Sequence, residues 1–153
     1  MASSWTQQVF VNGMAGGINL STDTLKGMLL KNSYTVNPDH KFVADLTPGT
    51  HECNATNYTG GFGGGGRKTL ASKTVTADDV NNRMVFDAAD LAAWTTLGGA
   101  TNNTLRYLAI IKEITSDAAS QVIAILDFGS DYNTNGGDFS VAFNSLGIGY
   151  VQV

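Results

Sequence analysis

Short runs of apolar residues, separated by polar and glycine-rich breaks, dominate the last third of the chain. Such runs lie at residues 104–114, 121–128, 138–143 and 148–153, and the third alternates apolar and polar side chains. Runs of this length, rich in β-branched residues and bounded by Asn, Asp, Gly and Ser, are typical of β-strands. Their close spacing favours antiparallel pairing. The pattern therefore predicts a mainly β fold.

The rest of the chain divides into an arm and the start of the folded domain. Residues 1–22 are predicted to form an extended N-terminal arm, in which Trp5 and Phe10 are anchors and several glycines loosen the chain. We expect the domain to fold without this arm. Residues 23–153 are predicted to form one antiparallel β-sandwich, Ig-like or jelly-roll-like, because 131 further residues are enough for a single core.

Helix is expected only in short pieces. Residues 24–31 fit either a strand or a short helix. Residues 38–46 begin with a proline suited to a first helical turn and place apolar residues on one face, which predicts a helix. Residues 87–97 are predicted to form a helical turn, whereas residues 67–76 and 83–86 fit strands.

A glycine run at residues 60–66 interrupts this pattern. Glycine has little conformational preference, so we expect this loop to be mobile unless a partner orders it. The spacing of Gly61 and Gly66 is that of a phosphate-binding loop, but Arg67 separates it from the Lys-Thr pair. A strand is predicted next, where that motif requires a helix. A flexible interface loop is the better interpretation.

The composition narrows the classes of partner. Only 14% of the residues are charged and the formal net charge is −4, so phosphate neutralisation is weak and nucleic-acid binding is not expected. No apolar run reaches the length of a membrane span. A single cysteine excludes an internal disulfide framework. A surface poor in charge and rich in Asn, Thr, Ser and Gly fits either an assembled subunit or an ordinary β domain.

Two clusters of polar residues contain side chains of the kinds that bind metal ions. Asp131, Asn133 and Asn135 fit the first half of a calcium loop, but Ala142 stands where the closing carboxylate is needed. Residues 51–53, His-Glu-Cys, do not complete a tetrahedral site. We therefore expect no metal, no cofactor and no catalytic residues.

Several short motifs follow one another in a characteristic order over nearly the whole chain: Phe10-x-x-Gly13, Asp23-Thr-Leu-Lys26, Tyr34-Thr-Val-Asn37, Asp45-Leu46, Lys73-Thr-Val75, Leu126-Asp127 and Asn135-Gly-Gly-Asp-Phe-Ser-Val141. In this order the chain resembles small virion structural proteins of tailed bacteriophages, of the capsid decoration or cement type. It departs from the pattern at residues 60–66 and 87–99. The resemblance implies a virion component without enzymatic activity.

The resemblance also implies partners and a location. We expect the protein to bind the major capsid protein on the outer surface of the virion head, after synthesis in the host cytoplasm, and to form a homo-oligomer, for which a trimer is the expectation. No nucleic acid and no membrane are expected as partners. Large aromatic side chains are the candidate interface residues: Trp5, Phe10, Phe62 and Trp94.

Two other functions stay open at this point. A tail, baseplate or fibre-associated virion protein fits the same features. A carbohydrate-binding β module is the second alternative, with stacking candidates at Trp5, Trp94, Tyr58 and Tyr132.

Overall fold

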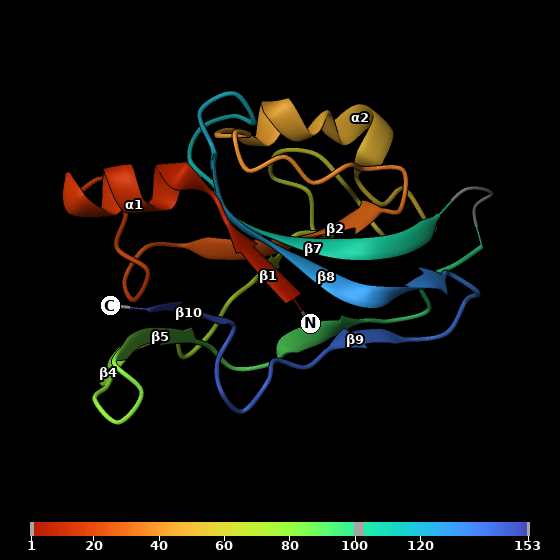
Figure 1. Ribbon diagram of the computed structural model, residues 1–153. Coiled ribbons are helices and arrows are strands. Elements are labelled where there is room, and N and C mark those ends of the chain that lie inside the picture. The colour runs from red at the N-terminus through yellow and green to blue at the C-terminus, as the bar shows by residue number, and fades with distance from the viewer. Residues whose placement is uncertain (1, 100–102, 153) are drawn as a thin grey trace.

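The computed structural model of the protein describes residues 2–99 and 103–152. The largest element is a five-stranded antiparallel sheet, which crosses the middle of the molecule (Figure 1). Its strands, in spatial order, are β1 (Ala2–Trp5), β8 (Gln121–Asn133), β7 (Thr104–Lys112), β2 (Leu25–Lys31) and β3 (Lys68–Thr69).

Two smaller antiparallel sheets lie beneath it in Figure 1. One is three-stranded, in the order β10 (Gly149–Gln152), β5 (Arg83–Asp87) and β4 (Thr74–Asp78). The other pairs β6 (Leu91–Trp94) with β9 (Phe139–Val141). The layers confirm the prediction of a mainly β, sandwich-like fold built from antiparallel strands.

The central strands of the large sheet are buried on both faces. On the lower face Leu29, Leu108 and Ile123 belong to the core shared with the smaller sheets, where Phe86 and Trp94 meet them. On the upper face a second apolar cluster covers the sheet, with members from the strands and from the chain between β2 and α2: Met28, Leu30, Ala109, Ile111, Val122, Ile125, Tyr34, Val43 and Leu46. Burial of both faces explains why these strands read as continuous apolar runs rather than as alternating ones.

The upper cluster is closed by two short helical pieces, the 3₁₀ helix η1 (Val43–Leu46) and α2 (Pro48–His51). The helix predicted at residues 38–46 therefore exists only in its second half. The Asp45 carboxylate accepts hydrogen bonds from the main-chain N–H groups of Lys41 and Phe42, both at 2.9 Å, which fixes the start of η1. Both bonds lower the pKa of Asp45, and the bond from Phe42 contributes most.

The N-terminal segment is not an extended arm. β1 pairs antiparallel with β8 over its whole length, and α1 (Gln7–Met14) follows it. Thr6, between them, is buried: its N–H donates to the Ile123 carbonyl at 3.1 Å, and its hydroxyl donates to the Val122 carbonyl at 2.6 Å. The segment is part of the sheet and the core, which corrects the prediction of a separate arm.

The helical turn predicted at residues 87–97 is also wrong, because this stretch contains β6. Leu91 and Trp94 are three residues apart, a spacing that suits one face of a helix. In the structure both are buried in a strand, and a shift of register between them lets both point inward. A β-bulge thus produces the burial pattern from which a helix was inferred.

Candidate functional site

An open apolar groove of about 530 Å³ lies between α1 and the three-stranded sheet. Phe10 and Met14 line it from the helix, and Val75, Met84 and Val151 line it from β4, β5 and β10. Met84 pairs directly with Val151 in the sheet, so their side chains project from the same face, toward the helix. One wall of the groove is therefore helical and the other is a sheet face.

Trp5 joins the two walls. Its ring lies 6.2 Å from that of Phe86 in the core and 6.4 Å from that of Phe10 on the helix. Its Nε1 donates a hydrogen bond to the main-chain oxygen of Tyr150 in β10, at 3.2 Å. Because Trp5 is held on three sides, the groove is preformed rather than assembled by loops.

The segment after α1 forms the rim of the groove. Gly16 follows Ala15, the C-cap of α1, with a φ of 77°, and the chain then turns toward β2. The Lys112 ammonium group holds this segment by donating to the Gly17 carbonyl at 2.8 Å and pairing with Asp23 at 2.7 Å. Burial would raise the pKa of Asp23, but the hydrogen bond from Lys112 and further favourable contacts lower it overall. The rim is thus fixed by an ion pair.

The groove is apolar and its helical wall carries no charge. No residue of α1 is acidic or basic. Met14 is 93% exposed, and Phe10, Val75 and Met84 are also classed as exposed. Contiguous apolar surface of this kind usually marks a contact with another molecule. Most of its lining is apolar, with the polar side chains of Asn19 and Ser21 at the rim, so what it mainly offers chemically is burial of apolar area.

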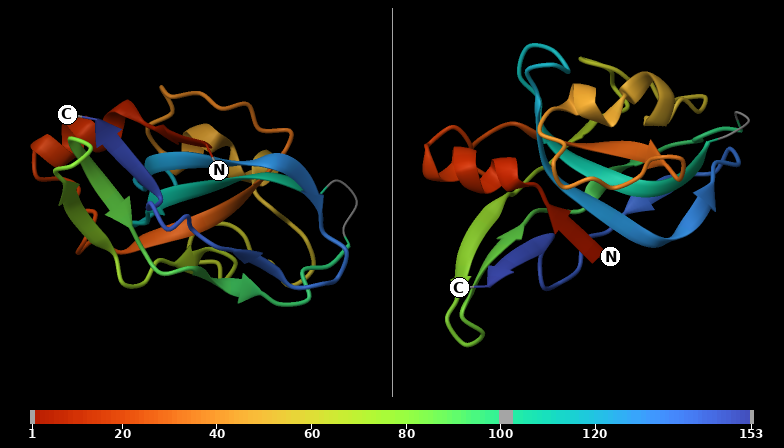
Figure 2. Two further views of the ribbon diagram at one scale, coloured as in Figure 1. Left: turned by 60° about the horizontal axis from the view of Figure 1, so that its bottom comes forward. Right: turned by 45° about the horizontal axis from the view of Figure 1, so that its top comes forward.

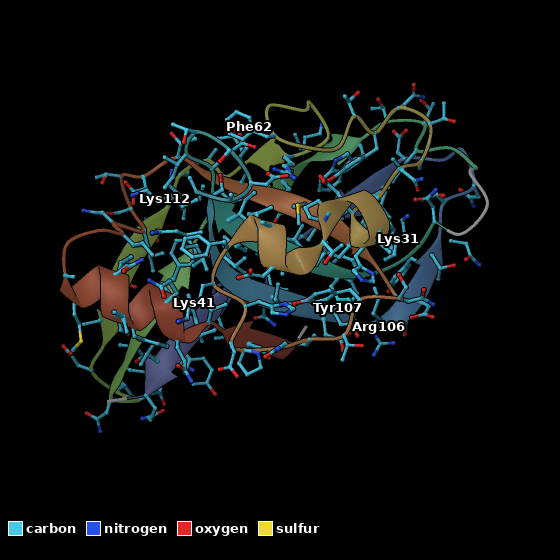
Figure 3. All side chains as sticks on the ribbon, turned by 90° about the horizontal axis from the view of Figure 1, so that it is seen from above. Lys31, Lys41, Phe62, Arg106, Tyr107 and Lys112 are labelled. Atoms are coloured by element: carbon cyan, nitrogen blue, oxygen red, sulfur yellow. The ribbon has the colours of Figure 1, made fainter. Side chains whose placement is uncertain are left out.

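The predicted interface residues separate into different parts of the molecule. Trp5 and Phe10 come together in the groove. Phe62 is 47% exposed, as expected of a contact residue, but it lies on the loop of residues 60–66, away from α1 (Figure 3). Trp94 is only 1% exposed and its Nε1 donates to the Gly66 carbonyl at 2.6 Å. Trp94 is a core residue, which corrects its assignment to the surface.

The glycine loop is held within the domain by a buried ion cluster. The Arg67 guanidinium, fully buried, binds both oxygens of Glu52, each at 2.9 Å, and pairs with Asp117 and Glu113. Burial would lower the pKa of Arg67, but its hydrogen bonds to Glu52 and Asp117 raise it. Glu52 also accepts from the Gly61 N–H at 3.0 Å. The expectation that a partner must order this loop is therefore corrected.

The sequence contained no clear signal for this cluster. In the sequence Arg67 stands out only because it interrupts a phosphate-binding motif. Glu113 and Asp117 lie about 50 residues further along the chain, and only the fold brings them to Arg67.

The polar clusters considered for metals have other roles. Asp131 and Asn133 lie in β8. The Asp131 carboxylate accepts a hydrogen bond from the side-chain amide of Asn32 at 2.8 Å. The side-chain oxygen of Asn133 accepts one from the Thr104 hydroxyl at 2.8 Å. Cys53 is buried, and burial raises its pKa to about 11. In residues 2–99 and 103–152 no group of three His, Cys, Asp or Glu side chains is placed to hold a metal ion.

The stacking residues proposed for a carbohydrate site do not form a common platform. Tyr58 and Trp94 are buried. Tyr132 is partly exposed, but its ring makes edge contacts with Phe128 and Phe139, at 5.9 and 6.0 Å between centroids. Trp5 ends β1 in the large sheet and lies in the groove between α1 and the three-stranded sheet. These positions give little support to carbohydrate binding.

Comparison with known proteins found no matching family model, no matching curated protein and no matching solved structure. Within the part of the chain that the structure describes, no helix is long and apolar enough to cross a membrane.

Proposed function

We propose that this chain is a non-enzymatic structural protein of a bacteriophage virion. In this proposal it is a capsid cement or decoration protein that binds the major capsid protein on the outer surface of the head. Two kinds of observation support it. The order of motifs resembles that of small phage virion proteins, and the domain exposes a preformed apolar groove between α1 and the three-stranded sheet.

The groove is the structural feature that best supports a contact with the capsid protein. Burying one large apolar side chain fully is worth roughly 1.5–3 kcal/mol. Phe10, Met14 and Met84 are therefore sufficient for a specific but modest contact if an apolar segment of the capsid protein occupies the groove. Packed DNA strains capsomer junctions outward, and many such contacts around one head add up through multivalency. The net charge of −4 suits a position outside the shell, away from the genome.

The proposal is tested by adding purified protein to phage heads that lack it and measuring occupancy. The variant Met14→Glu places a charge in the groove, and Val80→Glu is the matched control. Val80 is 90% exposed, lies in the β4–β5 turn and does not line the groove. Both variants add one negative charge to exposed positions, so both should melt like the unmodified protein.

We expect Met14→Glu to weaken binding about tenfold or more, which corresponds to ~1.4 kcal/mol, and Val80→Glu to bind as before. If the Met14→Glu variant still occupies heads fully, the groove is not the contact with the capsid protein. Binding to isolated tails but not to heads would replace the cement assignment with the tail-associated alternative.

A further inference from the structure

Strand β4 presents an open edge. It is the last strand of the sheet β10–β5–β4, and β5 is its one strand partner among the described residues. Figure 2 shows β4 as the outermost strand of this sheet in both views. Residues 74–77 are exposed, uncharged and free of proline. Natural proteins usually protect such an edge with charges, proline, a bulge or a covering segment, so an open one is suited to pairing.

The main-chain groups at this edge point in known directions. The Phe86 carbonyl accepts a hydrogen bond from the Ile148 N–H at 2.8 Å, so it faces β10 and turns away from β4. Val75 lies directly opposite Phe86. Main-chain groups alternate in direction along an antiparallel strand. The N–H and C=O groups of Val75 and Ala77 therefore point outward, and those of Thr76 point toward β5.

Nothing in the described part of the chain bonds to these outward groups. Two donors and two acceptors per chain are thus available in one row. Such a row can be satisfied by adding another strand, which is a common mode of recognition between proteins.

The sequence of this edge is complementary to itself. In an antiparallel pair centred on Thr76, the Thr76 residues of two copies face each other and Val75 faces Ala77 of the second copy. The same register brings Lys73 level with Asp79 of the second copy, and places no like charges opposite each other. Opposite charges across a strand pair are favourable and like charges are unfavourable. A register shifted by one residue would set Lys73 opposite Asp78, so charge does not exclude it. Main-chain direction does, because the shift would set the outward groups of Val75 opposite Thr76, whose groups point toward β5.

We propose that β4 pairs with β4 of a second copy of this chain, antiparallel and about a two-fold axis at Thr76. The two three-stranded sheets then form one continuous sheet. The interface is isologous, as in most homodimers. Val75, on the groove side, faces Ala77 of the second copy, so the two grooves open on the same face of the joined sheet.

We expect the dimer to be weak, so that its population depends on protein concentration. Two paired five-residue strands bury less surface than the roughly 1,200 Å² that stable interfaces bury. A dimer of this kind is an alternative to the trimer expected from the resemblance. The dimer does not depend on the proposed virion function. Dimerisation is measured on the free protein, whereas the virion function is measured by binding to particles.

Sedimentation over a concentration series tests the pairing with two substitutions in the same strand. Thr76→Lys places like charges opposite each other on the two-fold axis and should abolish the dimer. Thr74→Lys, two residues away on the same face, comes level with Asp78 of the second copy, so dimerisation should persist or strengthen. An equal mixture of Thr76→Lys and Thr76→Asp should form a heterodimer.

Amide hydrogen exchange on the unmodified protein gives an independent measurement. As concentration rises, the Val75 and Ala77 amides should become protected, whereas the Thr76 amide is already bonded within the sheet and should change little. A protein that stays monomeric throughout, a dimer that survives Thr76→Lys, or protection that does not change at Val75 and Ala77 would each overturn the proposal.

Discussion

Trp5 donates a hydrogen bond from its indole nitrogen to the main-chain oxygen of Tyr150, at 3.2 Å, although 145 positions separate the two residues. Trp5 ends the first strand of the large sheet, and Tyr150 lies in the last strand of the smaller one. The bond therefore joins the two sheets at the base of the groove. A segment that anchors both walls of the groove is expected to matter for stability as well as for binding.

Deletion of residues 2–17 should destabilise the domain by several kcal/mol. The deletion removes β1 from the edge of β8 and takes away Val9, whose burial alone is worth roughly 1.5–3 kcal/mol. Thr6→Val, which removes the hydroxyl that donates to the Val122 carbonyl and, at a longer distance, to the Ile123 carbonyl, should cost about 1 kcal/mol. Urea unfolding monitored by circular dichroism measures both. An unchanged midpoint for the truncated protein would show that this segment is dispensable for folding.

Arg67→Met should be among the most destabilising single substitutions. It leaves the carboxylates of Glu52 and Asp117 without their cation in a buried site, and removing one partner of a buried pair costs about 3–5 kcal/mol. Lys68→Met is the control, because the neighbouring Lys68 is only partly buried and has no ion pair within the described residues. Chemical denaturation of both variants gives the comparison. Equal stability of the two would mean that the ion cluster does not hold the loop.

Glu113 should make stability depend on pH. Burial raises the pKa of Glu113, but the hydrogen bond from Lys26 and other contacts lower it below 4.5 overall. A carboxyl group with a lowered pKa in the folded state stabilises the fold above its unfolded pKa, and this contribution is lost as pH falls through the folded value. The unmodified protein should therefore exceed Glu113→Gln in stability at neutral pH, with the gap closing in acid. A constant gap from pH 7 to about pH 3 would contradict this.

Phe62 and Trp94 should respond in opposite ways to truncation. Phe62→Ala removes an exposed ring from the glycine loop, so the free energy of unfolding should change by no more than about 0.5 kcal/mol. Trp94→Ala empties a core position and loses the bond to the Gly66 carbonyl, which should cost about 3–5 kcal/mol. Thermal melting distinguishes them, and a large loss for Phe62→Ala would place that ring in the core instead.

Local patterns were sufficient to predict most strands of this protein. β7 lies within a predicted apolar run, and the alternating run at residues 138–143 contains β9. β8 begins with the run at residues 121–128 but continues through the turn-rich residues after it to Asn133. The pattern failed where a local irregularity changed which side chains point inward. At Leu91 and Trp94 a β-bulge imitates helical spacing, and no feature of a single sequence reveals it.

The site was predictable only in part, because it depends on contacts between distant segments. The sequence singles out Trp5 and Phe10 as large aromatic residues in a glycine-rich stretch, and the structure places both in the groove. The opposite wall comes from β4, β5 and β10, whose approach to α1 no local pattern encodes. The glycine loop was misjudged because its order comes from Arg67 and two carboxylates that are remote in sequence.

Cryo-electron microscopy of virions of the phage that the proposed function implies tests the central claim most directly. The account predicts density for this fold on the outer surface of the head, at capsomer junctions, with α1 and its groove turned toward the major capsid protein. Density for the fold only in the tail, or none on the particle, would contradict it.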